Sequence, residues 1–339
     1  MVINLIDELR KAIDELDEEI LNNLSKRKSI VKEIAKLKKS MKIPVLDKGR
    51  EMQLRENLKN KAKENGLNVE LIDSIYSLIF ENSRIEQEIE NSDNPCPIKE
   101  IGLIGFGRFG RLAAKYLSQD FKVYVFHKSK NNQDAKEKNI VFSSLNEACK
   151  KEAVIIAVPI SELENTLKDA KKFLKKNALV IDVCSVKEYA VSMMEKILPS
   201  NVQILATHPL FGPDSAGESL FGRKIVLCRV KMHNGLYNQA KSFLKSKGIV
   251  VIEATPKEHD EQMAKSLVLT HLIGRALIEM KAGNLDIDTR GYRDLIKILD
   301  TVRNDSLQFF EDINKYNKYA AEVRKKFTQS LKNVEARLK

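Results

Sequence analysis

The chain has 339 residues, of which 43% are hydrophobic, and a formal net charge of +11. This length suits two or three domains, and the hydrophobic content is ordinary for a globular protein. No run of about 18 apolar residues occurs, so we expect no membrane-spanning helix and no membrane partner. The acidic, amphipathic amino terminus is unlike a secretion signal, and we therefore expect a cytoplasmic protein.

The excess of basic residues raises the possibility of a nucleic-acid partner. The lysines, however, lie among glutamates in stretches such as EIAKLKKS and ENLKNKAKENG, which is typical of solvated helix surfaces. We therefore expect no nucleic acid as a partner. The four cysteines are widely spread without a CxxC pair, so neither a disulfide framework nor a metal site is expected.

The first ninety residues have a helical pattern throughout. Apolar residues recur every three or four positions from Ile3 to Leu37, which predicts a helix of about 35 to 40 residues that ends before Pro44. Two shorter helices are predicted, one from near Lys48 and one over about 69–90. Because two short helices cannot cover the apolar stripe of so long a helix, we expect an intertwined homodimer.

After these helices the pattern changes twice. Residues 91–98 contain two prolines and small polar residues, which predicts a linker. Residues 99–255 alternate short apolar runs with helical stretches, as in a parallel sheet covered by helices. Residues 256–339 are helical again. The predicted fold is therefore multidomain, with an all-α domain over 1–90, an α/β domain, and a second all-α domain.

A glycine-rich turn opens the α/β segment. The sequence GFGRFG fits GxGxxG, follows the apolar run IGLI, and precedes the helical stretch RLAAKYLSQ, which is the context of a dinucleotide-binding turn. Such a turn brings the cofactor's pyrophosphate to the amino terminus of a helix. The predicted cofactor-binding residues are Gly105, Phe106, Gly107, Arg108, Phe109 and Gly110.

The end of the next strand bears on the choice of cofactor. Enzymes that use NAD commonly place an acidic residue there, whereas this chain has His127, Lys128, Ser129 and Lys130. These residues would attract a 2′-phosphate. The sequence predicts NADP, and the alternative is NAD with a basic surface loop.

A histidine marks a candidate catalytic site. His208 ends the apolar run QILATH and is followed by PLFGP, and Ser185 follows the preceding strand in DVCSVK. Ligands of open α/β sheets gather at the carboxyl ends of strands, and Ser185 could orient the imidazole.

Several motifs together resemble the prephenate and arogenate dehydrogenases of tyrosine synthesis. They are GLIGFGRFG, AVP, DVCSVK, THPLFGP, EHD and THLIGRAL, spread over about residues 99–330. The resemblance implies a Rossmann domain followed by a helical dimerisation domain. It implies that His208 takes the proton of the ring hydroxyl as hydride leaves, with support from Ser185. It also adds three residues to the cofactor site, Ala157, Val158 and Pro159.

The same resemblance suggests substrate contacts in the last segment. His271 and Arg275 lie four residues apart, share a helix face and could bind a carboxylate. Many bacterial members have a second histidine where this chain has Gly274. His259 could be only structural, whereas Asp260 could favour the ammonium group of arogenate.

Charged residues of the first helices form another set. Arg10, Arg27 and Lys38 are separated by nearly whole numbers of helical turns, and Ser83 and Gln87 lie four apart. Asp47, Arg50 and Glu51 begin the second predicted helix. A pocket lined by these side chains would hold two carboxylates, a hydroxyl and an ether oxygen.

This set resembles the all-helical chorismate mutases over residues 1 to about 90. The resemblance implies that Lys38 and Gln87 donate hydrogen bonds to the ether oxygen. It also implies that the substrate's carboxylates contact Arg10 of the partner subunit, Arg27 and Arg50. The ring hydroxyl would contact Asp47 and Glu51, and the ring carboxylate would contact Ser83.

The sequence therefore predicts two enzymes in one chain, which convert chorismate to prephenate and then to 4-hydroxyphenylpyruvate. One alternative is an arogenate dehydrogenase joined to the mutase. Another is a β-hydroxyacid dehydrogenase with a helical dimerisation arm, and a third is a basic NADP-sensing or nucleic-acid-binding protein.

Overall fold

A computed structural model of the chain describes residues 2–92, 96–128 and 137–338. The chain divides into two compact units. The first comprises residues 1–95 with 220–223 and 239–250, and the second comprises 96–219, 224–238 and 251–339. No helix in the described ranges is long and apolar enough to cross a membrane.

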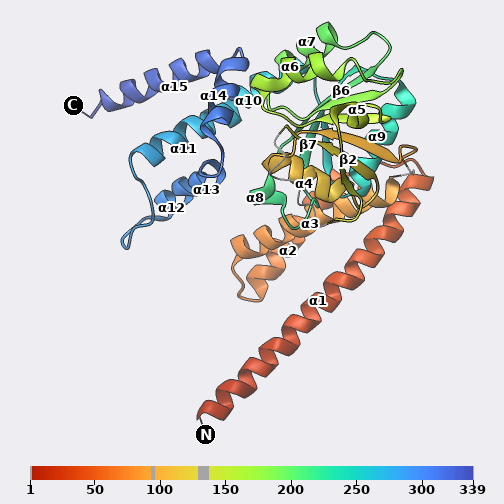
Figure 1. The fold of residues 1–339 in the computed structure, drawn as a ribbon. Helices are drawn as coiled ribbons and strands as arrows, with labels where there is room; N and C mark the ends of the chain where they lie inside the picture. The colour runs from red at the N-terminus through yellow and green to blue at the C-terminus, as the bar shows by residue number, and fades with distance from the viewer. Residues whose placement is uncertain (1, 93–95, 129–136, 339) are drawn as a thin grey trace. The chain divides into compact units, whose positions relative to one another are not determined.

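The amino-terminal helices are α1 (Val2–Ser40), α2 (Lys48–Glu64) and α3 (Val69–Asn91), as the periodicity predicts. The side chains of Asp47 and Asn68 cap α2 and α3. Figure 1 shows α1 running well past the other two helices. On α1, Val31 and Ala35 are buried, whereas the large apolar residues from Leu5 to Leu24 are exposed.

The second unit is built on an eight-stranded sheet with the order β3-β2-β1-β4-β5-β6-β7-β8. The strands are β1 (Glu100–Ile104), β2 (Lys122–Phe126), β3 (Ile140–Phe142), β4 (Ala153–Ile156), β5 (Leu179–Asp182), β6 (Gln203–Pro209), β7 (Lys224–Lys231) and β8 (Val250–Glu253). The helices between them are α4 (Arg108–Leu117), α5 (Leu145–Cys149), α6 (Ile160–Ala170), α7 (Lys187–Ile197), α8 (Pro213–Ala216) and α9 (Asn234–Ser246).

The pairings from β3 to β6 are all parallel, but β7 pairs antiparallel with β6. The expectation of a parallel sheet is therefore wrong for β7. The reason lies in the connection between β6 and β7, which contains only the four-residue helix α8 and no helix long enough for a parallel crossover.

The carboxy-terminal part is helical. It comprises α10 (Pro256–Met263), a π-helical segment (Ala264–Val268), α11 (Leu269–Glu279), α12 (Arg290–Ile296), α13 (Ile298–Val302), α14 (Leu307–Tyr316) and α15 (Ala320–Glu335). The predicted order of helical, Rossmann-like and helical parts is confirmed. The core of the sheet is formed by apolar side chains from adjacent strands, such as Ile104, Val154, Val180 and Ile204.

This topology gathers the sequence motifs at one edge. Because β1, β4, β5 and β6 run parallel, the segments that follow them leave the sheet on the same side. Those segments contain the glycine turn, the AVP sequence, the DVCSVK loop and the HPLFGP loop.

Candidate functional site

The glycine turn between β1 and α4 has a conformation that requires glycine at two positions. Gly105 has φ +106°, and a Cβ there would lie 2.1 Å from the carbonyl oxygen of Ala157. A Cβ on Gly110 would lie 2.3 Å from the carbonyl oxygen of Gly105. At Gly107, by contrast, a Cβ would meet no atom within 4 Å. The turn is thus tightly packed on one side and open at Gly107, as a bound pyrophosphate requires.

The amino terminus of α4 completes this cradle. Gly107 is its N-cap, and no side chain caps the helix. Its first N–H groups therefore suit an anion. Ala157 and Val158, which follow β4, are partly buried, and the exposed Pro159 precedes α6. The packing of this turn and the open amino terminus of α4 therefore fit a bound dinucleotide.

The side chain of Arg108 is already bound by protein groups. Its guanidinium lies 2.8 and 2.7 Å from the two carboxylate oxygens of Asp214, and it donates to the carbonyl oxygen of Asn304 at 2.6 Å. It thereby joins the glycine turn to α8 and to the segment before α14. A contact between this side chain and a cofactor would have to share the guanidinium with Asp214.

The basic cluster after β2 is described only in part. Lys128 lies 3.0 Å from the carboxylate of Glu162, and both side chains are exposed. His127 is partly buried. Ser129 and Lys130, which also belong to the predicted cofactor site, lie outside the described residues.

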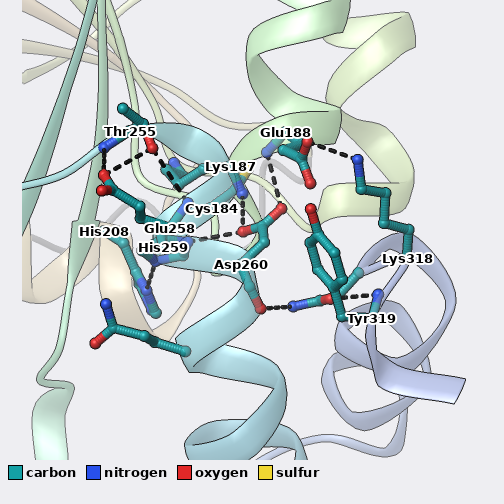
Figure 2. Close-up of polar contacts among 12 residues, drawn as sticks. Cys184, Lys187, Glu188, His208, Thr255, Glu258, His259, Asp260, Lys318 and Tyr319 are labelled. Carbon is teal, nitrogen blue, oxygen red and sulfur yellow. Dashed lines mark hydrogen bonds and ion pairs between the residues drawn. The ribbon is translucent and has the colours of Figure 1, made fainter. Parts of the chain in front are cut away.

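His208 is held in a buried row of three side chains. Its Nδ1 lies 2.8 Å from Nε2 of His259, whose Nδ1 lies 2.7 Å from Oδ1 of Asp260 (Figure 2). All three residues are at most 5% exposed. His259 and Asp260 belong to α10, whose start is fixed by a capping box between Thr255 and Glu258.

The surroundings of His208 keep its imidazole neutral. Burial holds its pKa well below the ordinary value, and the neighbouring His259 and Lys187 lower the pKa further. A neutral imidazole can accept a proton, so His208 has the state that a general base needs near neutral pH.

Asp260 also closes the amino terminus of a helix in the Rossmann part. Its Oδ1 and Oδ2 accept hydrogen bonds from the backbone N–H groups of Lys187 at 2.7 Å and Glu188 at 2.9 Å. These are the first two residues of α7, whose N-cap Val186 offers no side-chain cap. A carboxylate in this position is favoured by the helix dipole.

Lys187 is fully buried, which its place in the sequence does not suggest. Its ammonium group pairs with the buried carboxylate of Asp182 and donates to the carbonyl oxygen of Thr207. It thereby ties the end of β5 to the residue before His208. No hydrogen bond joins Ser185 to His208 among the described residues, and the orienting role predicted for Ser185 stays a prediction.

His271 and Arg275 lie together on α11, as their spacing predicts. His271 is 1% exposed, and its Nε2 is 3.5 Å from Asp305. Arg275 donates to the carbonyl oxygen of Asp305. Burial and the charge of Arg275 lower the pKa of His271 to about 4. Nδ1 of His271 and Nε of Arg275 are buried without a hydrogen-bond partner in the described part of the chain.

The packing of α11 explains why this chain has glycine at position 274, where many bacterial members have a second histidine. A Cβ on Gly274 would lie 2.6 Å from Cγ2 of Val302 on α13. The two helices approach too closely for a side chain at this position, so a histidine there would force them apart.

In the amino-terminal unit, the structure brings together three of the predicted mutase residues. The guanidinium of Arg27 on α1 donates to the hydroxyl of Ser83 on α3, and the amide of Gln87 donates to the carbonyl oxygen of Ser83 at 3.2 Å. Ser83 and Gln87 are buried. The Oε1 atom of Gln87 has no hydrogen-bond partner among the described residues.

The other predicted mutase residues make separate contacts. Lys38 donates to the carbonyl oxygen of Val45 at 2.7 Å, and the carboxylate of Asp47 accepts from the backbone N–H of Arg50 at 2.9 Å. Both oxygens of Glu51 lie 2.7 Å from the guanidinium of Arg84. Arg10 is exposed and pairs with Asp7, and it lies about 25 Å along α1 from Arg27.

Comparison with known proteins identifies both parts of the chain. Residues 9–88 match the family model for chorismate mutase type II. Residues 113–253 match that for the nucleotide-binding domain of prephenate dehydrogenase, and 276–339 match the TYRAAT1-like C-terminal domain. These matches indicate a chorismate mutase domain fused to a prephenate/arogenate dehydrogenase domain.

Individual relatives agree with this assignment. Arogenate dehydrogenase 1 of Arabidopsis thaliana is 29% identical over 74% of this chain, which spans only 41% of that relative. The T-protein of Haemophilus influenzae is 26% identical over 78% of the chain and 67% of its own length. The crystal structure of prephenate dehydrogenase from A. aeolicus with hydroxyphenyl propionate and NAD+ shares the fold, with a TM-score of 0.57 and 20% identity over 72% of this chain and 91% of that one.

The different packing of Gly107 and Gly110 predicts opposite effects of one added methyl group. Gly107→Ala leaves the thermal midpoint nearly unchanged, since its Cβ meets no atom, but weakens cofactor binding about tenfold because the methyl group occupies the open face. Gly110→Ala destabilises the fold by about 1–3 kcal/mol through overpacking. Thermal unfolding and cofactor titration measure both effects. A Gly107→Ala variant that binds cofactor as the unaltered chain does would contradict this location of the pyrophosphate.

Proposed function

We propose that this chain catalyses two successive reactions. The amino-terminal domain rearranges chorismate to prephenate, and the second part oxidises and decarboxylates prephenate to 4-hydroxyphenylpyruvate with a nicotinamide cofactor. The observation that carries the proposal is the buried, neutral His208 at the same sheet edge as the glycine turn. The two family matches supply the reaction classes.

The dehydrogenase reaction needs one base and close positioning. A nicotinamide bound at the glycine turn would accept the hydride of C4, and Nε2 of His208 would take the proton of the C4 hydroxyl. The bond from the ring to its carboxylate then breaks, and the electron pair makes the ring aromatic as CO2 departs. The oxygen at C4 becomes a phenolate, which takes the proton back from His208. The reaction therefore consumes no net proton, and the chain has only to hold C4 against the cofactor.

The substrate's carboxylate is assigned to α11. The unpartnered Nδ1 of His271 and Nε of Arg275 support this assignment, because buried polar atoms without partners are uncommon in folded proteins. A carboxylate that accepts hydrogen bonds from both residues would satisfy them. Ser185, in the loop after β5, would orient the imidazole of His208.

Prephenate and arogenate differ in one side-chain group, which is a keto group in prephenate and an ammonium group in arogenate. Asp260, the residue that could favour the ammonium, is 1% exposed and accepts three hydrogen bonds from the protein itself. It therefore offers nothing to a substrate. Since the fused mutase produces prephenate, we infer that prephenate is the substrate of the second reaction.

The mutase reaction is a pericyclic rearrangement and requires no nucleophile. Catalysis consists of holding the reactive conformer and stabilising negative charge on the ether oxygen. Arg27, Ser83 and Gln87 form one wall of this site. Lys38, Asp47, Arg50 and Glu51 contribute from the junction of α1 and α2, and Arg10 comes from the partner subunit.

Two substitutions should separate the activities. With chorismate and NADP, the unaltered chain produces NADPH. His208→Asn lowers prephenate oxidation by about 10²–10⁴-fold and leaves cofactor affinity and mutase activity intact. Gln87→Ala lowers mutase turnover by about 10²-fold, because one donor to the ether oxygen is lost, and leaves prephenate oxidation intact. His233→Asn, at an exposed histidine, is the matched control. Near-normal oxidation by His208→Asn would refute the assignment.

The preference for NADP rests on the cluster that includes His127 and Lys128. A 2′-phosphate would replace Glu162 as the partner of Lys128. We expect a lower Michaelis constant for NADP than for NAD, and a reversed order in Lys128→Glu, where a carboxylate repels the phosphate. Lys171→Glu, at the far end of α6, is the control and keeps the original preference. A clear preference of the unaltered chain for NAD would contradict this proposal.

Homodimerisation is proposed from the stripe on α1. Ile6, Leu9, Ile13, Leu16 and Ile20 are 44–59% exposed, and burying each side chain contributes about 1.5–3 kcal/mol. A second copy of α1 would cover the stripe and deliver its Arg10. Sedimentation velocity should show a dimer, and Ile13→Glu should weaken it and abolish mutase activity. Asn22→Glu adds the same charge on the opposite face and should do neither. A monomeric, mutase-active chain would disprove this.

A further inference from the structure

The buried row formed by His208, His259 and Asp260 is connected by two short contacts of imidazole nitrogens. Its two contacts, at 2.8 and 2.7 Å, join the proposed base to a carboxylate through one intervening imidazole (Figure 2). All three residues are at most 5% exposed, so solvent does not offer alternative partners. The hydrogen atom of each of these two contacts must therefore be carried by one of the three side chains.

The carboxylate determines where the hydrogens lie. Ionised Asp260 only accepts hydrogen bonds, so the hydrogen it shares with His259 is on Nδ1 of His259. A neutral His259 then presents the lone pair of its Nε2 to His208. Since that contact also needs one hydrogen, His208 must carry it on Nδ1. The lone pair of His208 is consequently on Nε2, away from the row.

Both carboxylate oxygens of Asp260 also accept hydrogen bonds from the backbone. The N–H groups of Lys187 and Glu188 donate to Oδ1 and Oδ2 from the amino terminus of α7, a helix of 11 residues. Neither oxygen is left without a donor, and the helix dipole favours the negative charge. The opposite hydrogen-bond direction would require a second proton, and therefore a positive charge, on His259.

We propose that His259 and Asp260 are positioning residues that hold His208 in its Nδ1–H tautomer. This inference rests on the proposed dehydrogenase function, in which Nε2 of His208 accepts the hydroxyl proton. In free histidine the Nε2–H tautomer predominates, and that form offers no lone pair at Nε2. When His208 becomes an imidazolium, its Nδ1–H still donates to His259, and Asp260 stabilises the positive charge through that ring.

The tautomer can be measured directly on the full chain without substrate. The protein has five histidines, so nitrogen-15 labelling of histidine with single-residue variants assigns each imidazole. We expect a protonated Nδ1 and an unprotonated Nε2 for His208. His259→Leu removes the acceptor, and His208 should revert to the Nε2–H form or a mixture. His233→Leu, at an exposed histidine, should leave the His208 signals unchanged.

Glutamine at position 259 tests the mechanism rather than the packing. Its amide can donate to Asp260 through nitrogen and accept from His208 through oxygen, which preserves the hydrogen-bond direction. His259→Gln should keep the Nδ1–H tautomer and stay within about tenfold of normal kcat. His259→Leu should lose about 10²-fold or more in kcat, with the cofactor KM unchanged. The larger loss reflects the wrong tautomer of the base.

Two results would overturn the inference. One is an Nε2–H tautomer of His208 in the unaltered protein, and the other is an equal loss of kcat in His259→Gln and His259→Leu when both are folded. Failure of the proposed function gives a different result. In that case the Nδ1–H tautomer is present, responds to His259→Leu, and the chain does not oxidise prephenate.

Discussion

The buried carboxylate of Asp260 is the constraint on which the dehydrogenase site depends. A charge in the interior must be fully compensated, and here three donors provide the compensation: two N–H groups of α7 and the imidazole of His259. Because these donors come from different segments, the carboxylate fixes α10 against α7. It thereby joins the start of the carboxy-terminal helices to the sheet edge where His208 lies.

A second buried charge supports the same edge. Lys187 lies directly after the loop that contains Ser185, and its ammonium group pairs with Asp182 and reaches the carbonyl oxygen of Thr207. Removing either partner of a buried pair is strongly destabilising, typically by about 3–5 kcal/mol. The positive charge also lowers the pKa of His208. One side chain thus holds two strand ends together and helps to keep the neighbouring imidazole neutral.

The mutase domain is governed by a different constraint. Its long helix leaves most of its apolar stripe uncovered, and Arg10 lies about 25 Å from Arg27 along the same helix. Among the described residues, the side chains of Arg27 and Gln87 meet at Ser83. The second copy of α1 proposed above would both cover the stripe and complete the site. The proposed dehydrogenase site, by contrast, has its histidine row and its glycine turn within one chain.

The sequence by itself determined the features that are local. Periodicity determined the helices of the first ninety residues, and GFGRFG between a strand and a helix marked the dinucleotide turn, because these signals depend on neighbouring residues. The spacing of His271 and Arg275 placed them on one helix face for the same reason. The position of His208 at a strand end was also readable, since the end of an apolar run marks the end of a strand.

Only the tertiary structure decided the long-range contacts. His259 is 51 residues from its partner His208, and Asp260 is 73 residues from Lys187, so no spacing rule connects them. The burial of Lys187, the crowding of Gly274 by Val302 and the antiparallel direction of β7 likewise follow from how distant segments pack. Sequence patterns report which face of an element is apolar, whereas a hydrogen-bond row requires the atoms of several elements at fixed distances, which only the folded chain provides.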